Sequence, residues 1–298
     1  MMTSAKQIKQ SDTIAIIGLG RMGHGIARNL IKAGFKLKGL SHAGNQPVDD
    51  LIAQGAVMCE DIKTLVDGAD LAIICVTGTE DVEAVLCGSG GILDSAKSPL
   101  MVMDCSTGIP EDTRKRHDQA AQKGHFFFDA AMTRTPAEAA EGRLNLIIGG
   151  DDGLREKIAP VLDAIAEVVT MAGQIGMGQE AKLIHNFVSL GFSAILGEAA
   201  ARADHAGISR EMFLELIGKG GGGGVIFDRF NPYLAEGRKD AFNFTISNAA
   251  KDLGYFERIV GKDSLNAAIL ALYQDADQRD DTTVPELVSY ISKTIKAD

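Results

Sequence analysis

The first half of the chain alternates short apolar runs with segments of helical periodicity. The apolar runs have the length of strands and lie at 13–20, 37–40, 71–76, 100–105, 126–132 and 144–150. The helical segments between them lie at 21–33, 60–67, 80–86 and 110–123. Strands that alternate with helices predict βαβ units, so we expect a mostly parallel, doubly wound sheet with helices on both faces.

The second half of the chain has a different pattern. One long helical segment covers 178–206, and shorter ones follow at 209–217, 225–236, 244–260, 265–279 and 284–295. Strand-like runs are missing after about residue 175. The sequence therefore predicts two domains, an α/β domain at 1–174 and an all-α domain at 175–298 that is entered through the long helix.

Charge and composition restrict the classes of partner. Asp and Glu number 40 against 30 Lys and Arg, which gives a net charge of −10. General binding to nucleic acid or to anionic membranes needs clustered positive charge, so neither is expected. Glycine is common, with 34 residues, which indicates sharp turns or close backbone approach at many places.

The cysteines and the N-terminus indicate the compartment. The four cysteines contain no C-x-x-C pair, so we expect no metal site and interpret them as small thiols of a reducing cytoplasm. The first twelve residues lack an apolar core of a signal peptide, and no stretch approaches the 18 apolar residues of a membrane span. A cytoplasmic protein is expected.

A glycine fingerprint follows the first predicted strand. The residues are Gly18, Leu19, Gly20, Arg21, Met22 and Gly23, and they match G-x-G-x-x-G between a strand and a helix. The first glycine permits the tight turn, the second lets a pyrophosphate approach the backbone, and the third lets helix and strand pack closely. Amide groups at the helix N-terminus then hold the phosphates. This context predicts a dinucleotide site.

The end of the second predicted strand bears on the choice of cofactor. Sites that prefer NAD usually carry an Asp or Glu there, about 20 residues after the fingerprint, to bind the ribose hydroxyls. Here Ser41 and His42 occupy this place and no acid is present. Ser41 can donate to a 2′-phosphate and His42 can pair with one. The sequence thus favours NADP, with NAD as the alternative; His42 could also be a loop residue without a role.

A polar stripe runs along the long helix. The segment 181–194 is apolar on nearly all sides, which predicts a buried helix. It nevertheless carries five polar residues that share one face at helical spacing, namely Lys182, His185, Asn186, Ser189 and Ser193. Lysine is rarely buried without a partner or a function, and burial favours the neutral amine that can exchange protons. The alternative is that Lys182 reaches the surface near the helix start.

Four motifs in order resemble those of the β-hydroxyacid dehydrogenase family, which includes 3-hydroxyisobutyrate dehydrogenase, tartronate semialdehyde reductase and sulfolactaldehyde reductase. They are the fingerprint with the following 27–30 (ARNL), the segment 104–107 (DCST), the segment 176–182 (GMGQEAK) with Asn186, and the segment 251–253 (KDL). The likeness covers nearly the whole chain. It implies a Rossmann domain, a helical domain, an active site in the cleft between them, and a homodimer or homotetramer.

The resemblance also implies roles for single residues. Lys182 would be the catalytic acid or base and Asn186 its partner. The substrate side would comprise Ser106, Thr133, Arg134, Thr135 and Lys251. The cofactor side would comprise the fingerprint and Ser41, His42, Val76, Thr77, Thr107 and Lys251.

The departures from the family bear on the substrate. Arg134 and Thr135 stand where relatives have two glycines, and Thr133 keeps the hydroxyl of the usual serine. A similar G-R-T occurs in the sulfolactaldehyde reductase branch, and a guanidinium fits a carboxylate or a sulfonate. Arg134 could instead point to solvent or pair with Glu138.

The run 220–224 is five glycines, which could line the substrate cleft or form a flexible loop. His185 stands where the family often has asparagine.

These residues predict an NAD(P)-dependent oxidoreductase that interconverts a small anionic β-hydroxy or ω-hydroxy acid and its aldehyde. Lys182 would move the proton while the cofactor exchanges a hydride. Two alternatives are an imine reductase of the same architecture, which usually has another residue in place of the lysine, and a non-catalytic sensor of NADP(H), which has no need of a proton donor.

Overall fold

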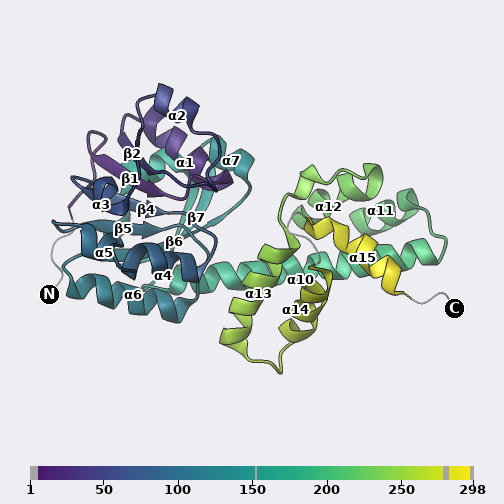
Figure 1. The fold of residues 1–298 in the computed structure, drawn as a ribbon. Coiled ribbons are helices and arrows are strands. Elements are labelled where there is room, and N and C mark those ends of the chain that lie inside the picture. The colour runs from purple at the N-terminus through teal and green to yellow at the C-terminus, as the bar shows by residue number, and fades with distance from the viewer. Residues whose placement is uncertain (1–5, 152, 278–281, 296–298) are drawn as a thin grey trace. The chain divides into compact units, whose positions relative to one another are not determined.

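The glycine turn joins β1 to α1 at the centre of a twisted sheet (Figure 1). The structure is a computed structural model that describes residues 6–151, 153–277 and 282–295. The strands are β1 (Thr13–Ile17), β2 (Lys36–Leu40), β3 (Val57–Cys59), β4 (Leu71–Ile74), β5 (Met101–Asp104), β6 (Phe126–Thr133), β7 (Leu144–Gly149) and β8 (Ala166–Gly173). Their order in the sheet is β3-β2-β1-β4-β5-β6-β7-β8.

The strands pair as the alternation of elements predicts, with one exception. The neighbours from β3 to β6 are parallel, and so are β7 and β8. Within the described sheet, β6 and β7 form the one antiparallel pair. The predicted doubly wound, mostly parallel sheet is thereby confirmed. Because β1 lies between β2 and β4, the chain turns in opposite directions on its two sides, and such a switch point is where open α/β sheets bind ligands.

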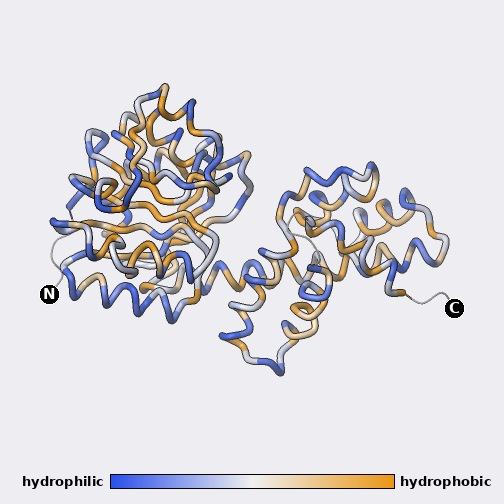
Figure 2. The backbone as a smooth tube through the Cα atoms, viewed as in Figure 1, coloured by the Kyte–Doolittle hydropathy of each residue, from blue (hydrophilic) through white to orange (hydrophobic). Residues whose placement is uncertain are grey.

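Helices cover both faces of the sheet. They are α1 (Arg21–Lys32), α2 (Asp49–Ala53), α3 (Ile62–Val66), α4 (Thr79–Cys87), α5 (Ile92–Ser95), α6 (Pro110–Gln122), α7 (Pro136–Ala140), α8 (Leu154–Lys157) and α9 (Ala159–Ile165). Side chains of α1, α7 and α9 share one core with Ile14 and Ile16 of β1. Side chains of α3 to α6 share the opposite core with Ala15 and Ile17. Figure 2 shows the apolar residues concentrated along the strands between these layers.

Two strands were not predicted. β3 has three residues, too few to show a period. β8 has eight residues, all half-buried or exposed, and it begins directly after α9 with no turn residue to mark its start. β8 follows the predicted run at 144–150 and forms the edge of the sheet.

The second half is helical, as predicted. The elements are α10 (Met177–His205), α11 (Arg210–Lys219), α12 (Val225–Glu236), α13 (Ile246–Val260), α14 (Leu265–Ala276), α15 (Leu287–Thr294) and the 3₁₀ turns η1 (Asp240–Phe242) and η2 (Val284–Glu286). The expected helix at 265–279 ends at Ala276, and residues 278–281 lie outside the described part. Phe230, Leu253 and Tyr273 belong to a separate core of this half.

The chain divides into two compact units, one up to Lys182 and one from Leu183 onward. This division lies eight residues after the boundary at 174/175 that the sequence suggested, because α10 begins within the first unit. Asp129 of β6 holds the first turn of α10 within the first unit. The domain boundary at 174/175 stays a prediction.

The expectation that α10 is buried on all sides is wrong for this chain. Ile184, Val188 and Ile195 are 50, 63 and 63% exposed, whereas the polar Lys182 and Asn186 are 9 and 6% exposed. Lys182, Asn186 and Ser193 of the polar stripe thus face inward, whereas His185 is exposed and Ser189 half-buried, and an apolar stripe faces outward. The reason is that the other described helices of the chain cover only part of the circumference of α10.

The hydropathy of α10 also differs from expectation. By length and composition this helix could cross a membrane, contrary to the expectation that no stretch is apolar enough. Half of its most apolar window is buried within the protein, and core helices of soluble proteins pass the same test. The inward-facing Lys182, Asn186 and Ser193 are the polar residues of a core helix rather than of a lipid-facing one.

Candidate active site

The glycine fingerprint forms a turn in which side chains have no room. Gly18 has a φ of 92°, and a Cβ there would overlap the carbonyl of Cys75 at the end of β4. A Cβ on Gly23 would overlap the carbonyl of Gly18, so this glycine lets α1 pack on the turn. A Cβ on Gly20 would meet nothing within 4 Å. The backbone at Gly20 therefore borders open space.

This turn fits the pyrophosphate of a dinucleotide. Gly20 is the N-cap of α1, it makes no side-chain cap, and the first turn of the helix carries no acidic residue. Helix amide groups at such an end attract phosphate. Arg21 is exposed, Met22 is half-buried and Leu19 is buried beneath the turn. The Leu19 amide donates to Asn45 Oδ1 at 3.2 Å, which ties the turn to the loop after β2.

The loop after β2 brings together residues for the adenosine end of the cofactor. Asn45 Nδ2 donates to the carbonyl of Leu40 at 2.9 Å and holds this loop over the end of the strand. The Ser41 hydroxyl donates to Glu60 Oε1 at 2.8 Å. His42 is exposed, and its Nδ1 accepts from the Gly44 amide at 3.0 Å. An acid is therefore present beside Ser41, although no acid follows β2 in the sequence.

The ends of β4 and β5 are joined through Ser106. The amide of Val76 donates to Ser106 Oγ at 3.0 Å, so two residues predicted for the cofactor and the substrate lie together. Ser106 is only 2% exposed, and its hydroxyl oxygen holds the backbone after β4 against the loop after β5 through this bond. Thr77 is exposed and Thr107 is half-buried. Contacts of Thr77 and Thr107 with a cofactor remain predictions.

Two buried carboxyl groups lie side by side on β5 and β6. Asp104 and Asp129 are opposite each other in the strand register, and both are fully buried. Burial raises the pKa of Asp104 to about 7, although the Ser106 amide donates to its Oδ1 at 2.9 Å and opposes the shift. Burial also raises the pKa of Asp129 above its usual value.

Asp129 anchors the beginning of α10. Its Oδ1 accepts from the Gly176 amide at 2.8 Å, and its Oδ2 accepts from the Gln179 amide at 2.9 Å. A Cβ on Gly178 would lie 2.6 Å from Oδ2, so glycine is needed for this close approach. The carboxylate thus acts as an N-cap supplied from the sheet. The helix that carries Lys182 starts from this fixed point.

Lys182 and Asn186 lie one helical turn apart on α10, and both are buried. Asn186 Nδ2 donates to Asp252 Oδ2 on α13 at 2.7 Å. Lys251 Nζ lies 2.9 Å from Asp252 Oδ1, which balances the charge of this buried carboxylate. The bond to a carboxylate fixes which end of the Asn186 amide carries the nitrogen. His185 Nδ1 lies 3.1 Å from Asn186 Oδ1.

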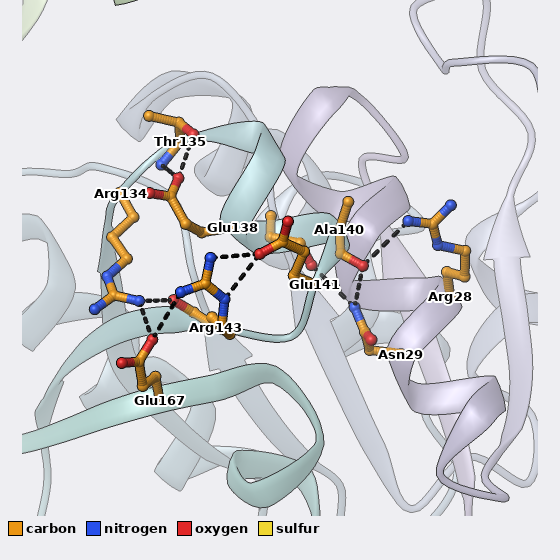
Figure 3. A network of polar contacts seen from close by, with 10 residues as sticks. Arg28, Asn29, Arg134, Thr135, Glu138, Ala140, Glu141, Arg143 and Glu167 are labelled. Carbon is orange, nitrogen blue, oxygen red and sulfur yellow. Dashed lines mark hydrogen bonds and ion pairs between the residues drawn. The ribbon is translucent and has the colours of Figure 1, made fainter. Parts of the chain in front are cut away.

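The predicted substrate loop lies in the polar network of Figure 3. Arg134 Nη1 donates to the carbonyl of Arg143 at 2.7 Å and is paired with Glu167 of β8. The two expected alternatives for Arg134, solvent and Glu138, are both wrong. Glu138 instead accepts from the amide and hydroxyl of Thr135, the N-cap of α7, in a capping box.

The backbone of the substrate loop keeps a glycine conformation without a glycine. Arg134 has a φ of 82° and is the one non-glycine residue with positive φ in the described part of the chain. The side chain of an L-residue is strained there. The contacts with Glu167 and Arg143 stabilise the guanidinium and offset this strain. Thr133, at the end of β6, is half-buried.

The network also connects the substrate loop to α1. Asn29 Nδ2 donates to the carbonyls of Ala139 and Ala140 at 3.0 and 3.2 Å, and Arg28 donates to Ala140 at 3.1 Å (Figure 3). A Cβ on Gly25 would overlap the backbone of α7 at 2.7 Å, so α1 and α7 are in close contact. The helix after the cofactor turn thus positions the short helix after Arg134.

The glycine run at 220–224 connects α11 and α12. Gly220 is the C-cap of α11, and Gly224 is the N-cap of α12 with a φ of 141°. The prediction of an interhelical loop is confirmed. A role of this loop at the substrate remains a prediction.

Four residues of this site were missed from the sequence. They are Glu60, Glu167, Gln179 and Asp252. Gln179 and Asp252 lie within the motifs at 176–182 and 251–253, but neither was assigned a role from the sequence. Glu60 and Glu167 follow or lie on strands that the sequence pattern did not reveal. Among the described residues, no group of three or more His, Cys, Asp or Glu could hold a metal ion.

Comparisons with known proteins agree with this arrangement. Residues 13–173 match the family model of the NAD-binding domain of 6-phosphogluconate dehydrogenase. Residues 176–279 match the model described as NAD-binding of NADP-dependent 3-hydroxyisobutyrate dehydrogenase.

Curated relatives are similar over most of the chain. The NAD-dependent L-serine dehydrogenase of Pseudomonas aeruginosa is 30% identical over 289 residues, which cover 92% of this chain and 97% of that protein. The 3-sulfolactaldehyde reductase of Escherichia coli is 30% identical over 241 residues, 81% of this chain and 80% of that protein.

A solved structure shares the fold. The 3-hydroxyisobutyrate dehydrogenase of Mycobacterium tuberculosis, solved with L-serine, superposes with a TM-score of 0.83 at 24% identity and covers 94% of this chain and 99% of that one. Together with the two family models and the relatives, the paired Lys182 and Asn186 and the glycine turn place the chain in one family. This protein belongs to the β-hydroxyacid dehydrogenases, a family of NAD(P)-dependent oxidoreductases.

Proposed function

We propose that this enzyme interconverts a small anionic β-hydroxy or ω-hydroxy acid and its aldehyde, with Lys182 as the acid and base. The observation that carries the proposal is the buried pair on α10. Lys182 and Asn186 are 9 and 6% exposed and one turn apart, and Asn186 is held by Asp252. A buried ammonium group beside a fixed amide suits proton transfer to an oxygen atom.

The chemistry divides between cofactor and protein. When bound at the glycine turn, a nicotinamide cofactor accepts or supplies the hydride. In reduction, the Lys182 ammonium donates a proton to the substrate oxygen as it becomes an alkoxide. In oxidation, the neutral Lys182 amine removes the hydroxyl proton. Asn186 orients the substrate oxygen toward Lys182, because its own amide nitrogen is fixed by Asp252.

The acid group of the substrate is assigned to the loop after β6. We assign Thr133, Arg134, Thr135 and Ser106 to this side, together with Lys251. The contacts of Arg134 with Arg143 and Glu167 both use Nη1, and a guanidinium can bind a second anion through its other edge. The Escherichia coli relative is named for an aldehyde that carries a sulfonate, which supports a carboxylate or sulfonate substrate here.

The assembly and location also follow as proposals. The outward apolar stripe of α10 supports a homodimer or homotetramer, because large exposed apolar patches mark interaction sites. The four cysteines are free thiols, which supports a reducing compartment such as the cytoplasm.

The test is turnover of Lys182→Met on a panel of small acids and aldehydes with both cofactors. The panel comprises 3-hydroxyisobutyrate, serine, succinate semialdehyde, tartronate semialdehyde and sulfolactaldehyde. We expect kcat to fall about 10²–10⁴-fold, as for loss of a general acid or base, with little change in cofactor affinity. The matched control is Lys219→Met. Lys219 is exposed on α11, where it pairs with Glu215 one turn earlier in that helix.

Two results would contradict the proposal. Near wild-type kcat in Lys182→Met would show that another group moves the proton. A wild-type protein that binds the cofactor but turns over no carbonyl or alcohol would instead point to an imine reductase or a sensor, and a cyclic imine added to the panel separates these two.

A further inference from the structure

We infer that Glu60 supplies the carboxylate that selects NAD over NADP, although it follows β3 rather than β2. The inference rests on the proposed function only in that the glycine turn binds a dinucleotide. It reverses the preference for NADP that the sequence of β2 suggested. Glu60 would be a specificity-determining residue for the cofactor.

Strand register brings Glu60 to the ribose end of the site. β2 and β3 are parallel, and their last residues, Leu40 and Cys59, are opposite each other. The Ser41 amide donates to the Cys59 carbonyl at 2.8 Å, so the chains leave both strands side by side. Ser41 stands where NAD-binding folds carry the acid that holds the ribose hydroxyls. Glu60, the next residue after β3, reaches that place through the adjacent strand.

The bond between Ser41 and Glu60 determines what each can offer a ligand. The Ser41 hydroxyl donates its one proton to Glu60 Oε1 at 2.8 Å, so its oxygen is left as an acceptor. The two ribose hydroxyls of NAD can donate one to that oxygen and one to the Glu60 carboxylate. A 2′-phosphate is mainly an acceptor and carries negative charge, so it would find no donor in this pair and would be repelled by the carboxylate.

Two nearby groups that could carry positive charge, His42 and Lys38, are already engaged in hydrogen bonds. His42 Nδ1 accepts from the Gly44 amide at 3.0 Å, and an accepting nitrogen carries no proton. A positively charged His42 would have to give up this bond. The Lys38 ammonium is engaged by the carbonyls of Thr64 and Asp67 at 3.2 and 2.7 Å.

Asp61 provides a matched comparison. It is adjacent to Glu60 and is also exposed, but its Oδ1 accepts from the Thr64 amide at 2.7 Å as the N-cap of α3. Asn also serves as an N-cap, so Asp61→Asn removes one negative charge and keeps the local structure. Glu60→Gln removes the same charge from the group that faces Ser41.

The experiment measures cofactor binding by titration calorimetry, without a substrate. The ligands are NAD and NADP, together with the fragments adenosine 5′-monophosphate and adenosine 2′,5′-bisphosphate. We expect the wild-type protein to bind NAD at least about tenfold more tightly than NADP. Glu60→Gln should lower this ratio about tenfold or more, chiefly through tighter NADP binding, and Asp61→Asn should change it less than threefold. The fragments should follow the same order.

The outcomes separate this inference from the proposed function. Equal or tighter binding of NADP by the wild-type protein would overturn the role of Glu60, and so would an unchanged ratio in Glu60→Gln. Neither result would affect the assignment of Lys182, which depends on turnover. Binding of no dinucleotide at all would overturn the inference and the proposed function together.

Discussion

Gln179, on the first turn of α10, holds the loop that begins at Ser106. Its Nε2 donates to the carbonyl of Ser106 at 2.8 Å, and its Oε1 accepts from the amide of Gly108 at 2.9 Å. Both ends of one buried side chain are thereby satisfied by the backbone after β5. The two motifs that the sequence shows more than 70 residues apart are joined by this single amide.

Gln179→Ala should lower both stability and turnover. The substitution leaves a buried carbonyl and a buried amide without partners, which costs about 1–3 kcal/mol. The Ser106 loop should then be less ordered, so kcat should fall more than the affinity for cofactor. Urea unfolding and steady-state kinetics measure the two effects. Gln122→Ala, at an exposed position at the end of α6, should change neither, and equal effects of both variants would argue against this role.

Substitutions at Arg134 should separate backbone strain from the ion pair. Arg134→Gly and Arg134→Ala both remove the contacts with Glu167 and Arg143. At a φ of 82°, alanine should be less stable than glycine by about 1 kcal/mol. The free energy of unfolding of the two variants gives this difference directly. Equal stabilities would mean that the loop relaxes out of the left-handed region when the arginine is lost.

The sequence predicts those parts of the fold that depend on local pattern. The β1 turn and α10 carry strong signals, because a glycine fingerprint and a helical period are both contained within short segments. The pair of Lys182 and Asn186 is predicted for the same reason, since one turn of one helix separates them. The close contact between α1 and α7 was not predicted, because the need for glycine at position 25 arises only where these two helices, distant in the sequence, meet.

The missed features depend on contacts between strands. Glu60 reaches Ser41 because β3 pairs in register with β2, and Glu167 reaches Arg134 through β8. β3 is too short to show a period, and β8 continues directly from α9, so the hydrophobic pattern marks neither strand. The apolar residues of α10 were expected to be buried by this chain, because pattern shows that a face is apolar and does not show what covers it.

The stability of the protein should depend on pH through Asp104. Burial raises the pKa of this carboxyl to about 7, against about 3.9 in an unfolded chain. Between these values the folded protein holds a proton that the unfolded chain releases, so the free energy of unfolding falls as pH rises from about 4 to about 7. Asp104→Asn removes this titration and should show a shallower fall in urea unfolding across the window. Asp118→Asn, at an exposed position, should keep the wild-type slope, and an unchanged slope in Asp104→Asn would assign the effect to another group.

A charge on the outward stripe of α10 should reduce the molar mass in solution. Ile184, Val188 and Ile195 are at least half exposed along one side of this helix, and water contact of such a stripe is unfavourable. If a second copy covers it, Val188→Lys places a charge in that interface, and buried charge without a partner is costly. Light scattering after gel filtration should show the wild-type protein as a dimer or tetramer and the variant as a smaller species. Val57→Lys provides the control, because Val57 is 56% exposed on β3 and the same charge there should leave the molar mass unchanged. A Val188→Lys protein with the wild-type mass would show that assembly uses another surface.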